Sequence, residues 1–354
     1  MALARHALII LASFAFSLVL RGQQSVFSKI FSVPYDTHYI SSYTTDYTTR
    51  VYSSVKYSMM GYDDGIANQR LAYRPNNKML LGIGANHGFL GINIGFNLPF
   101  LNQDDHKYGE TEYYDFTLRM FAPRFNLTGY LQTYKGFYLR NTSTVISGWE
   151  EGDPYYIRPD IRTNTIGLEI SYIFNSKRFS YRAAVVQTEW QKKSAGSLLV
   201  GGSVIYNITV ADSSIVPTNL VFPYFYEGVE FDRSYNFSFG PLIGYAYTLV
   251  IKKHYFITGS INGSLNIGFT HLQIDKSEER VKSGPIVGFR NEVLVSAGYN
   301  SALWYFGVSY VNMGITNQAP LPDRSISYDT GMFRMNIVRR FETKKPIKLL
   351  NPGR

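Results

Sequence analysis

The stretch from Tyr255 to Phe269 alternates between two kinds of side chain. Successive side chains of a β-strand point to opposite faces, so this alternation predicts a strand with one apolar face and one small, polar face. The apolar face comprises Ile257, Gly259, Ile261, Gly263, Leu265, Ile267 and Phe269, and the other comprises Thr258, Ser260, Asn262, Ser264, Asn266 and Gly268. The stretch from Pro285 to Tyr299 is a candidate partner of the same kind.

The same alternation recurs along most of the chain. It is clear at 50–59, 114–120, 166–174, 198–208 and 331–341, and at 79–98 its phase flips at His87-Gly88, as a tight hairpin or a bulge requires. A soluble sandwich would turn the apolar faces inward, whereas an outer-membrane barrel turns them toward lipid. Frequent recurrence, an export signal and the absence of cysteine favour the barrel. We therefore predict an all-β fold, a transmembrane antiparallel β-barrel of the outer-membrane type with about 12 to 14 strands.

Composition agrees with a barrel. Charged residues make up 17% of the 354 residues, below the roughly 25% of soluble domains, and aromatic residues make up 16%. Mean hydropathy is nevertheless slightly negative at −0.13, which a helical membrane protein would not show. The formal net charge of +9 fits either attraction to anionic lipid headgroups or solutes, or a solvated exterior with a basic tail, and we favour the second. No basic cluster with interleaved aromatics occurs, so we expect no nucleic-acid partner.

The sequence divides into four parts. Residues 1–22 read as a signal peptide, because Arg5 and His6 precede an apolar run of 14 residues, Ala7 to Leu20. The alternative is a membrane anchor, but a helical span needs about 20 residues. An extended segment, 23–49, precedes the barrel at 50–341, and a basic tail follows at 342–354. This arrangement predicts export to the outer membrane of a Gram-negative cell.

The connections alternate in length, as outer loops and periplasmic turns do. Long segments at 98–110, 140–162, 270–284 and 313–328 alternate with short turns near 123, 176, 253 and 300. Residues 179–188 are predicted to return across the wall as a strand. That strand would make both neighbours of the segment Ala211 to Tyr235 run toward the periplasm. We therefore expect this segment, which carries Pro217 and Pro223, to cross the height of the barrel as a plug or an irregular strand.

Several strings resemble one protein family. The chain resembles the family called domain of unknown function 4421, from Bacteroidota, over nearly the whole mature sequence. The resemblance implies an outer-membrane-type β protein and implies no reaction and no catalytic residues. It is carried by Tyr35-Asp36-Thr37-His38-Tyr39-Ile40, Leu71-Ala72-Tyr73-Arg74-Pro75-Asn76, Phe100-Leu101-Asn102, Lys107-Tyr108-Gly109-Glu110-Thr111, Tyr134-Lys135-Gly136-Phe137-Tyr138-Leu139-Arg140-Asn141 and Asp212-Ser213-Ser214-Ile215-Val216-Pro217.

Candidate site residues are charges on the predicted inner face. Each would cost about 2–4 kcal/mol on the lipid face at mid-membrane, so they are expected to line the lumen. They either pair and fill the barrel, which we favour, or form a polar path for a solute. These lumen-facing candidates are Asp115, Arg119, Glu169, Arg290, Glu292 and Arg334.

The sequence predicts no metal site, cofactor or catalytic residue. No two histidines lie at metal-ligand spacing, and no nucleophile elbow occurs. The acidic clusters Asp63-Asp64, Asp104-Asp105 and Glu150-Glu151-x-Asp153 are interpreted as solvated loop charges in preference to calcium ligands.

The function that follows is an outer-membrane barrel, either a narrow channel or a structural or assembly component. Its expected partners are outer-membrane lipid and a small solute, with protein partners left open. One alternative is an outer-membrane hydrolase acting on lipid or peptide, which would use His106 or His271 at the rim. Another is a soluble periplasmic β protein.

Overall fold

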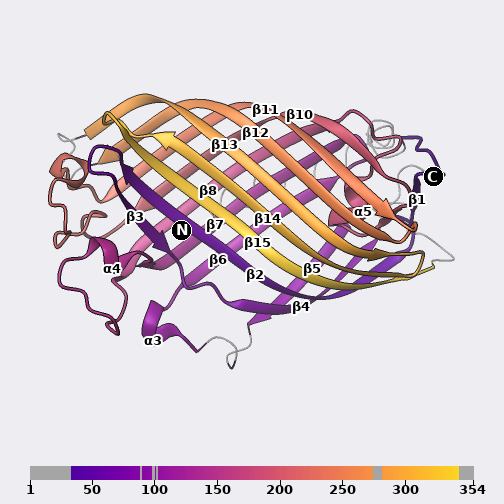
Figure 1. Cartoon of the computed structure of the whole chain (residues 1–354), viewed down its shortest axis with the longest axis horizontal. Helices are drawn as coiled ribbons and strands as arrows, with labels where there is room; N and C mark the ends of the chain where they lie inside the picture. Colours follow the sequence, from indigo (N-terminus) through magenta and orange to yellow (C-terminus); the bar gives the residue numbers. More distant parts are fainter. Residues whose placement is uncertain (1–32, 88–89, 98–99, 101–102, 274–280, 343–354) are drawn as a thin grey trace, which may run out of the picture.

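The computed structural model describes residues 33–87, 90–97, 100, 103–273 and 281–342 (Figure 1). Within these residues, thirteen strands form one antiparallel sheet, and a second sheet contains two short strands. The large sheet comprises β2 (Tyr47–Asp64), β3 (Gln69–Arg74), β4 (Met79–His87), β5 (Leu90–Asn97), β6 (Glu112–Phe121), β7 (Phe125–Leu139), β8 (Ile157–Ile173), β10 (Ala195–Val210), β11 (Arg233–Ile251), β12 (Tyr255–Gln273), β13 (Val281–Asn300), β14 (Trp304–Gln318) and β15 (Arg324–Phe341). The remaining elements are β1 (Ile40–Ser42), β9 (Glu189–Gln191), α3 (Asp105–Tyr108), α4 (Thr142–Val145), α5 (Tyr181–Val185) and the short 3₁₀ helix η2 (Phe225–Gly228).

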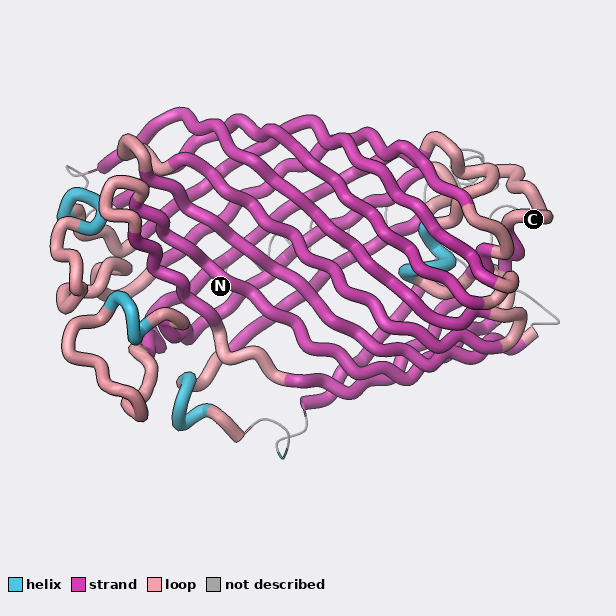
Figure 2. The backbone as a smooth tube through the Cα atoms, in the orientation of Figure 1, coloured by secondary structure: helices cyan, strands magenta, loops and turns pink. Residues whose placement is uncertain are grey.

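The large sheet closes on itself. The last strand, β15, pairs with β2 from Arg324↔Asp64 to Phe341↔Tyr47, so the ladder has no free edge on that side. Ten strands make the closed ring, in the order β2, β3, β7, β8 and then β10 to β15. The strands cross the long axis diagonally, as Figure 2 shows, which is the tilt that closure requires. The predicted all-β antiparallel barrel is confirmed, but its closed ring has ten strands, fewer than the 12 to 14 expected, because β4, β5 and β6 belong to the sheet without completing the ring.

The barrel wall is apolar outside and polar inside. Along β12, the aliphatic side chains Ile261 and Leu265 are 62% and 68% exposed, whereas Asn262 and Ser264 are buried. This arrangement is the reverse of that in a soluble sandwich, whose apolar faces pack against each other. The alternation seen in the sequence therefore separates an outer from an inner face, as in outer-membrane barrels.

The two ends of the barrel differ. At one end, which we call the turn end, short turns join β6 to β7, β11 to β12 and β13 to β14. At the other, the loop end, longer connections run over 140–156 and 211–232. In Figure 1 the loop end with α4 lies on the left and the turn end with α5 on the right.

The expected strand at 179–188 is wrong. Its residues instead form α5, and Ser180 caps that helix by accepting a hydrogen bond from the amide of Ala183 at 3.0 Å. Ala183 and Ala184 are strong helix formers, and both are buried in the turn end of the barrel. The connection near 176 is consequently no simple turn, since α5 and β9 separate β8 from β10.

The expectation that Ala211 to Tyr235 crosses the barrel is wrong for the same reason. Without a strand at 179–188, β10 runs toward the loop end and β11 returns from it. The segment between them begins and ends at the loop end, where the amide of Ala211 donates to the carbonyl of Asp232 at 2.8 Å. It is a loop that folds over the barrel mouth.

The wall is interrupted between β5 and β6. β3 pairs with β7 at only two positions, Tyr73↔Leu139 and Arg74↔Tyr138. Toward the turn end, the hairpin β4–β5 and the hairpin β6–β7 then diverge. In the described part of the chain β5 pairs only with β4, β6 pairs only with β7, and the two do not run alongside each other. We call this interval between β5 and β6 the seam.

Two residues explain why the seam begins where it does. Pro75 follows the last β3–β7 pair directly and has no amide hydrogen with which to continue the ladder. On the facing strand, Gly136 has a φ of +89°, and the β7–β8 register shifts between Lys135 and Phe137. A β-bulge of this kind bends its strand and ends regular pairing.

Substituting Gly136 tests this account. In Gly136→Ala the new methyl group would lie 2.2 Å from the carbonyl oxygen of Glu110, in a left-handed conformation. That conformation alone costs about 1–2 kcal/mol, so we expect a loss of at least that much stability in urea titrations in lipid vesicles. Gly259→Ala is the control, because nothing lies within 4 Å of its added methyl group. Equal stability of the two variants would contradict the role of Gly136.

Candidate functional site: the seam and the charged interior

The apex of the seam is held by side chains in place of a strand ladder. The amide of Asn76 donates to the hydroxyl of Thr111 at 2.8 Å, and that hydroxyl donates to the carbonyl of Gly136, also at 2.8 Å. Asn141 reaches back to β3, where it accepts from the amide of Ala72 at 3.1 Å and donates to the carbonyl of Arg70 at 2.6 Å. Three of the strings that carry the family resemblance therefore meet at this point.

The turn before β6 is fixed to the same apex. The side-chain amide of Asn76 donates to Asp105 at 2.9 Å and to the carbonyl of Gly109 at 3.0 Å. Lys78 forms ion pairs with Asp104, at 3.2 Å, and with Asp105. Both carboxylates at 104–105 thus have a lysine partner within the protein. Among the described residues, no group of histidine, aspartate and glutamate could hold a metal ion.

Three of the candidate charges form one buried cluster. Arg290 of β13 is 1% exposed and donates to Glu169 of β8 on the opposite wall. The same guanidinium nitrogen lies 3.2 Å from Glu292. Because two carboxylates share one guanidinium, the cluster carries a net negative charge. It spans the lumen and occupies the space through which a solute would pass.

Asp115 is paired with a cation that the sequence analysis did not select. Its carboxylate lies 2.9 Å from the ammonium of Lys56 and accepts the hydroxyl of Tyr134 at 2.8 Å. The Asp115 side chain is 3% exposed, whereas that of Lys56 is 28% exposed. Lys56 was detectable, because the alternation of 50–58 places it on the polar face of its strand.

Arg119 and Arg334 differ from the other candidates. Neither forms an ion pair or a hydrogen bond with any residue that the structure describes, and the buried Nε of Arg334 has no partner. Their positive charges act on one another. Arg119 lies on β6, and its cross-strand row continues through Thr128 to the buried Glu169, so it faces the interior.

Arg334 is held by a ring in place of a carboxylate. Its guanidinium lies 4.5 Å from the ring centroid of Tyr52, a cation–π distance. Tyr52 lies against Gly82 and Gly95, where an added methyl group would come within 2.2 and 3.2 Å of the tyrosine. The glycines of β4 and β5 make room for the ring on the inner face, next to the seam.

The loop end is closed by a hydrophobic cap. Residues 211–232 place Ile215, Phe225, Tyr226 and Phe231 in a buried cluster with side chains of β2, β3 and β7. The hydroxyl of Tyr226 donates to the carbonyl of Ser325 at 2.7 Å.

Charged residues fasten this cap to the wall. Asp64 accepts the amide of Tyr226 at 2.7 Å and pairs with Arg324 at 3.2 Å. Arg324 also binds Glu227 of the cap at 3.0 Å. Asp63 lies near Arg70, with 3.5 Å between the charged atoms. Asp64 therefore anchors the cap, whereas Asp63 pairs within the wall.

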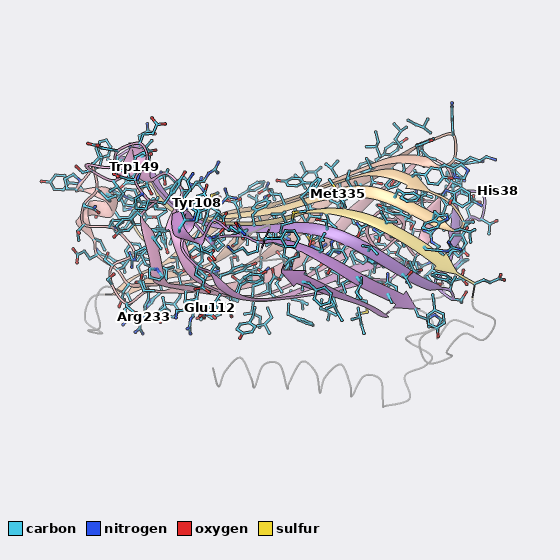
Figure 3. All side chains as sticks on the ribbon, turned by 90° about the horizontal axis from the view of Figure 1, so that it is seen from below. His38, Tyr108, Glu112, Trp149, Arg233 and Met335 are labelled. Carbon is cyan, nitrogen blue, oxygen red and sulfur yellow. The ribbon has the colours of Figure 1, made fainter. Side chains whose placement is uncertain are left out.

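The turn end is closed by a plug made of α5, β9 and the N-terminal strand β1. Arg340 donates to the carbonyl of Gln187 at 2.6 Å and to Asn300 at 2.9 Å, and Arg50 donates to the carbonyl of Val186 at 2.9 Å. The expected extended segment thus contributes to the plug, since β1 pairs with β9. Figure 3 shows both ends, with Trp149 at the loop end and His38 beside the plug.

Between the cap and the plug, many inward-facing side chains are buried, among them Glu169, Asn262 and Arg290. A cavity of about 30 Å³ lies beneath the cap, lined by polar side chains such as Gln132 and Asn207 and by rings such as Tyr134. A space of this size holds a water molecule or two.

The rim histidines expected for a hydrolase do not form a catalytic arrangement among the described residues. The Nδ1 atom of His271 lies 2.9 Å from the hydroxyl of Ser283, but this pair is on the outer face beside Tyr235. His106 lies in α3 and is exposed. No described carboxylate contacts the His271–Ser283 pair, so nothing described there would orient the histidine as a base.

Breaking the buried cluster should be costly. Arg290→Met leaves Glu169 and Glu292 unpaired in the interior, and such a loss costs about 3–5 kcal/mol. Arg70→Met, at a half-exposed pair, should change stability by less than about 1 kcal/mol. The free energy of unfolding in lipid vesicles, measured for both variants, checks this. Similar values would show that the cluster does not hold the barrel together.

Comparison with solved structures finds distant similarity to several outer-membrane proteins. The outer-membrane protease OmpT from Escherichia coli aligns with a TM-score of 0.37 and 9% identity, over 85% of this chain and 98% of that one. A FadL homologue from Pseudomonas aeruginosa aligns with a TM-score of 0.24 and 7% identity, over 84% and 91% of the two chains. OprG from the same organism gives 0.20 and 11%, over 84% and 96%. These scores carry no argument about activity.

Sequence comparison gives one negative and one positive result. No curated protein sequence matches this chain. Among the described residues, none of the helices has both the length and the apolar character of a membrane span. The family model described as domain of unknown function (DUF4421) matches residues 34–341, which is nearly the whole described chain. The chain therefore belongs to the DUF4421 family.

Proposed function

We propose that the protein is an outer-membrane barrel that does not conduct solutes in bulk and serves as a structural or assembly component of that membrane. The observation that carries the proposal is the combination of an apolar outer wall with a lumen closed at both ends. The wall exposes side chains such as Ile261 and Leu265, which only a lipid environment would cover. The loop end would face outward and the turn end the periplasm.

The interior supports a closed barrel over a channel. A conducting pore needs a continuous aqueous path, and selectivity then comes from charged rings along that path. Here the cap, the Arg290 cluster and the plug lie one after another along the barrel. The cavity beneath the cap, at about 30 Å³, holds only a water molecule or two. The alternative function, a narrow channel, has less support, which comes only from Arg119 and Arg334, since neither forms an ion pair with a described residue.

The membrane location has a direct test. In Leu265→Arg a charge replaces a side chain at the middle of β12 that is 68% exposed. Facing lipid, this should cost about 2–4 kcal/mol of stability. Ile66→Arg is the matched control, because Ile66 is 67% exposed but lies in the turn between β2 and β3, where water can reach the charge. Unfolding in lipid vesicles and the fraction folded on unboiled gels give the readout. If both variants behave as wild type, the outer wall does not face lipid.

Conductance tests the closed lumen. Wild-type protein in planar bilayers should pass no steady current above the lipid background. A variant in which residues 213–230 are replaced by a short glycine–serine linker, combined with Arg340→Met to loosen the plug and Arg290→Met to break the cluster, should show openings. Each change alone should leave the other two barriers in place. A large, steady wild-type current would overturn the proposal and favour a channel.

A further inference from the structure

We propose that the seam between β5 and β6 binds a membrane lipid with an anionic headgroup, the acyl chains lying against the outer wall and the headgroup reaching the interior cations. This inference rests on the proposed membrane location. Because both ends of the barrel are closed, such a lipid would reach the interior through the side wall.

The seam requires something to cover it. In hydrocarbon, an unpaired backbone amide or carbonyl costs several kcal/mol, which is why membrane barrels close completely. The edges of β5 and β6 that face the seam have no ladder partner in the described part of the chain. Both lie in the apolar part of the wall, since Ile94 of β5 and Phe116 of β6 are exposed.

The two sides of the seam suit an amphiphile. Outside, each strand presents apolar side chains: Ile92, Ile94 and Phe96 on β5, and Tyr114, Phe116 and Leu118 on β6. Inside, β5 presents only small groups such as Asn93 and Gly95, and both of these residues are exposed. The inner edge is therefore open and polar, whereas the outer edge offers surface on which acyl chains can pack.

The charges behind the opening select an anion. Lys56, Arg119 and Arg334 face the interior on this side, where Asp115 pairs with Lys56 and Glu169 lies in the cross-strand row of Arg119 and feels its charge. Among the described residues, neither Arg119 nor Arg334 forms an ion pair with a carboxylate. Guanidinium groups bind phosphate bidentately, and a phosphate brought in by a lipid would satisfy both arginines. Tyr52 already orients Arg334 beside β5.

A protein strand fits the seam less well. β5 runs toward the loop end and β6 toward the turn end. A single inserted strand would be antiparallel to one edge and parallel to the other, so an antiparallel ladder needs two inserted strands. The apex at Asn76, Thr111 and Gly136 is also tied together, which limits how far the edges can spread.

The test is lipid retention by the purified full-length barrel, measured by native mass spectrometry after exchange into mixed micelles. Phosphatidylglycerol is compared with phosphatidylcholine of the same acyl chains. Wild type should retain phosphatidylglycerol preferentially, and Arg119→Gln with Arg334→Gln should weaken that retention by roughly tenfold. The matched control, Lys252→Gln with Lys253→Gln, removes two exposed cations from the β11–β12 turn and should have little effect.

A substitution that is expected to increase lipid retention provides a second test. Asp115→Asn releases Lys56 from the one ion pair that it forms with a described residue and should increase retention of phosphatidylglycerol. Inorganic phosphate at high concentration should compete weakly, because it supplies the headgroup charge without the chains. Displacement by phosphate as strong as by lipid would show a plain anion site and overturn the lipid assignment.

Other outcomes are equally decisive. Equal loss in the control and the seam variants would place the lipid at the surface and refute the proposal, as would a co-purifying protein strand cross-linked at the seam. Unboiled gel migration and bilayer current are recorded for the same samples. If the barrel is folded and non-conducting but retains phosphatidylglycerol and phosphatidylcholine equally, the lipid site is refuted and the proposed function still stands.

Discussion

Backbone hydrogen bonding is the constraint on which this structure depends. In the proposed membrane location the wall that exposes Ile261 and Leu265 would face lipid, where every strand edge must find a partner. The pairing of β15 with β2 over the full length of both strands meets that requirement where the first and last strands of the ring come together. The seam is the one interruption in the described wall, so its apex carries side-chain bonds from Asn76 and Thr111 where a ladder would otherwise run.

The closed interior follows from how charge is arranged. Arg290 spans from β13 to Glu169 of β8, and its cluster closes the middle of the lumen, while Arg340 and Arg50 hold the plug by its backbone carbonyls. Paired charges of this kind stabilise a filled barrel only because each finds a partner. Arg119 and Arg334 break that rule, and both lie on the side of the seam.

Much of the fold was predictable from the alternation of side chains. Strands such as β12 and the β4–β5 hairpin followed from period two and from the phase flip at His87-Gly88. The segment 179–188 was not predictable in this way, because a buried plug helix also carries apolar residues and its Ser180 cap looks like any turn residue. One wrong strand reversed the expected direction of β10, and the misplacement of 211–235 followed from it.

The candidate site was predicted in part. Alternation selected the inward charges, but which of them pair depends on distances across the lumen, which no local pattern contains. Glu169 and Arg290 are 121 residues apart and meet only because the sheet closes. The seam had visible signs in Pro75 and Gly136, yet each alone is also compatible with an ordinary turn or bulge. Their effect appears only when β3 and β7 become neighbours.

The most direct measurement is a single-cysteine scan along β12, since the natural chain contains no cysteine. Each position from 257 to 269 would carry a fluorescent label in the refolded barrel, with quenching by a nitroxide-bearing lipid as the readout. The account predicts strong quenching at the odd positions, such as Ile261 and Leu265, and weak quenching at the even positions between them. Uniform quenching, or strong quenching at the even positions, would contradict a lipid-facing apolar wall around a closed polar interior.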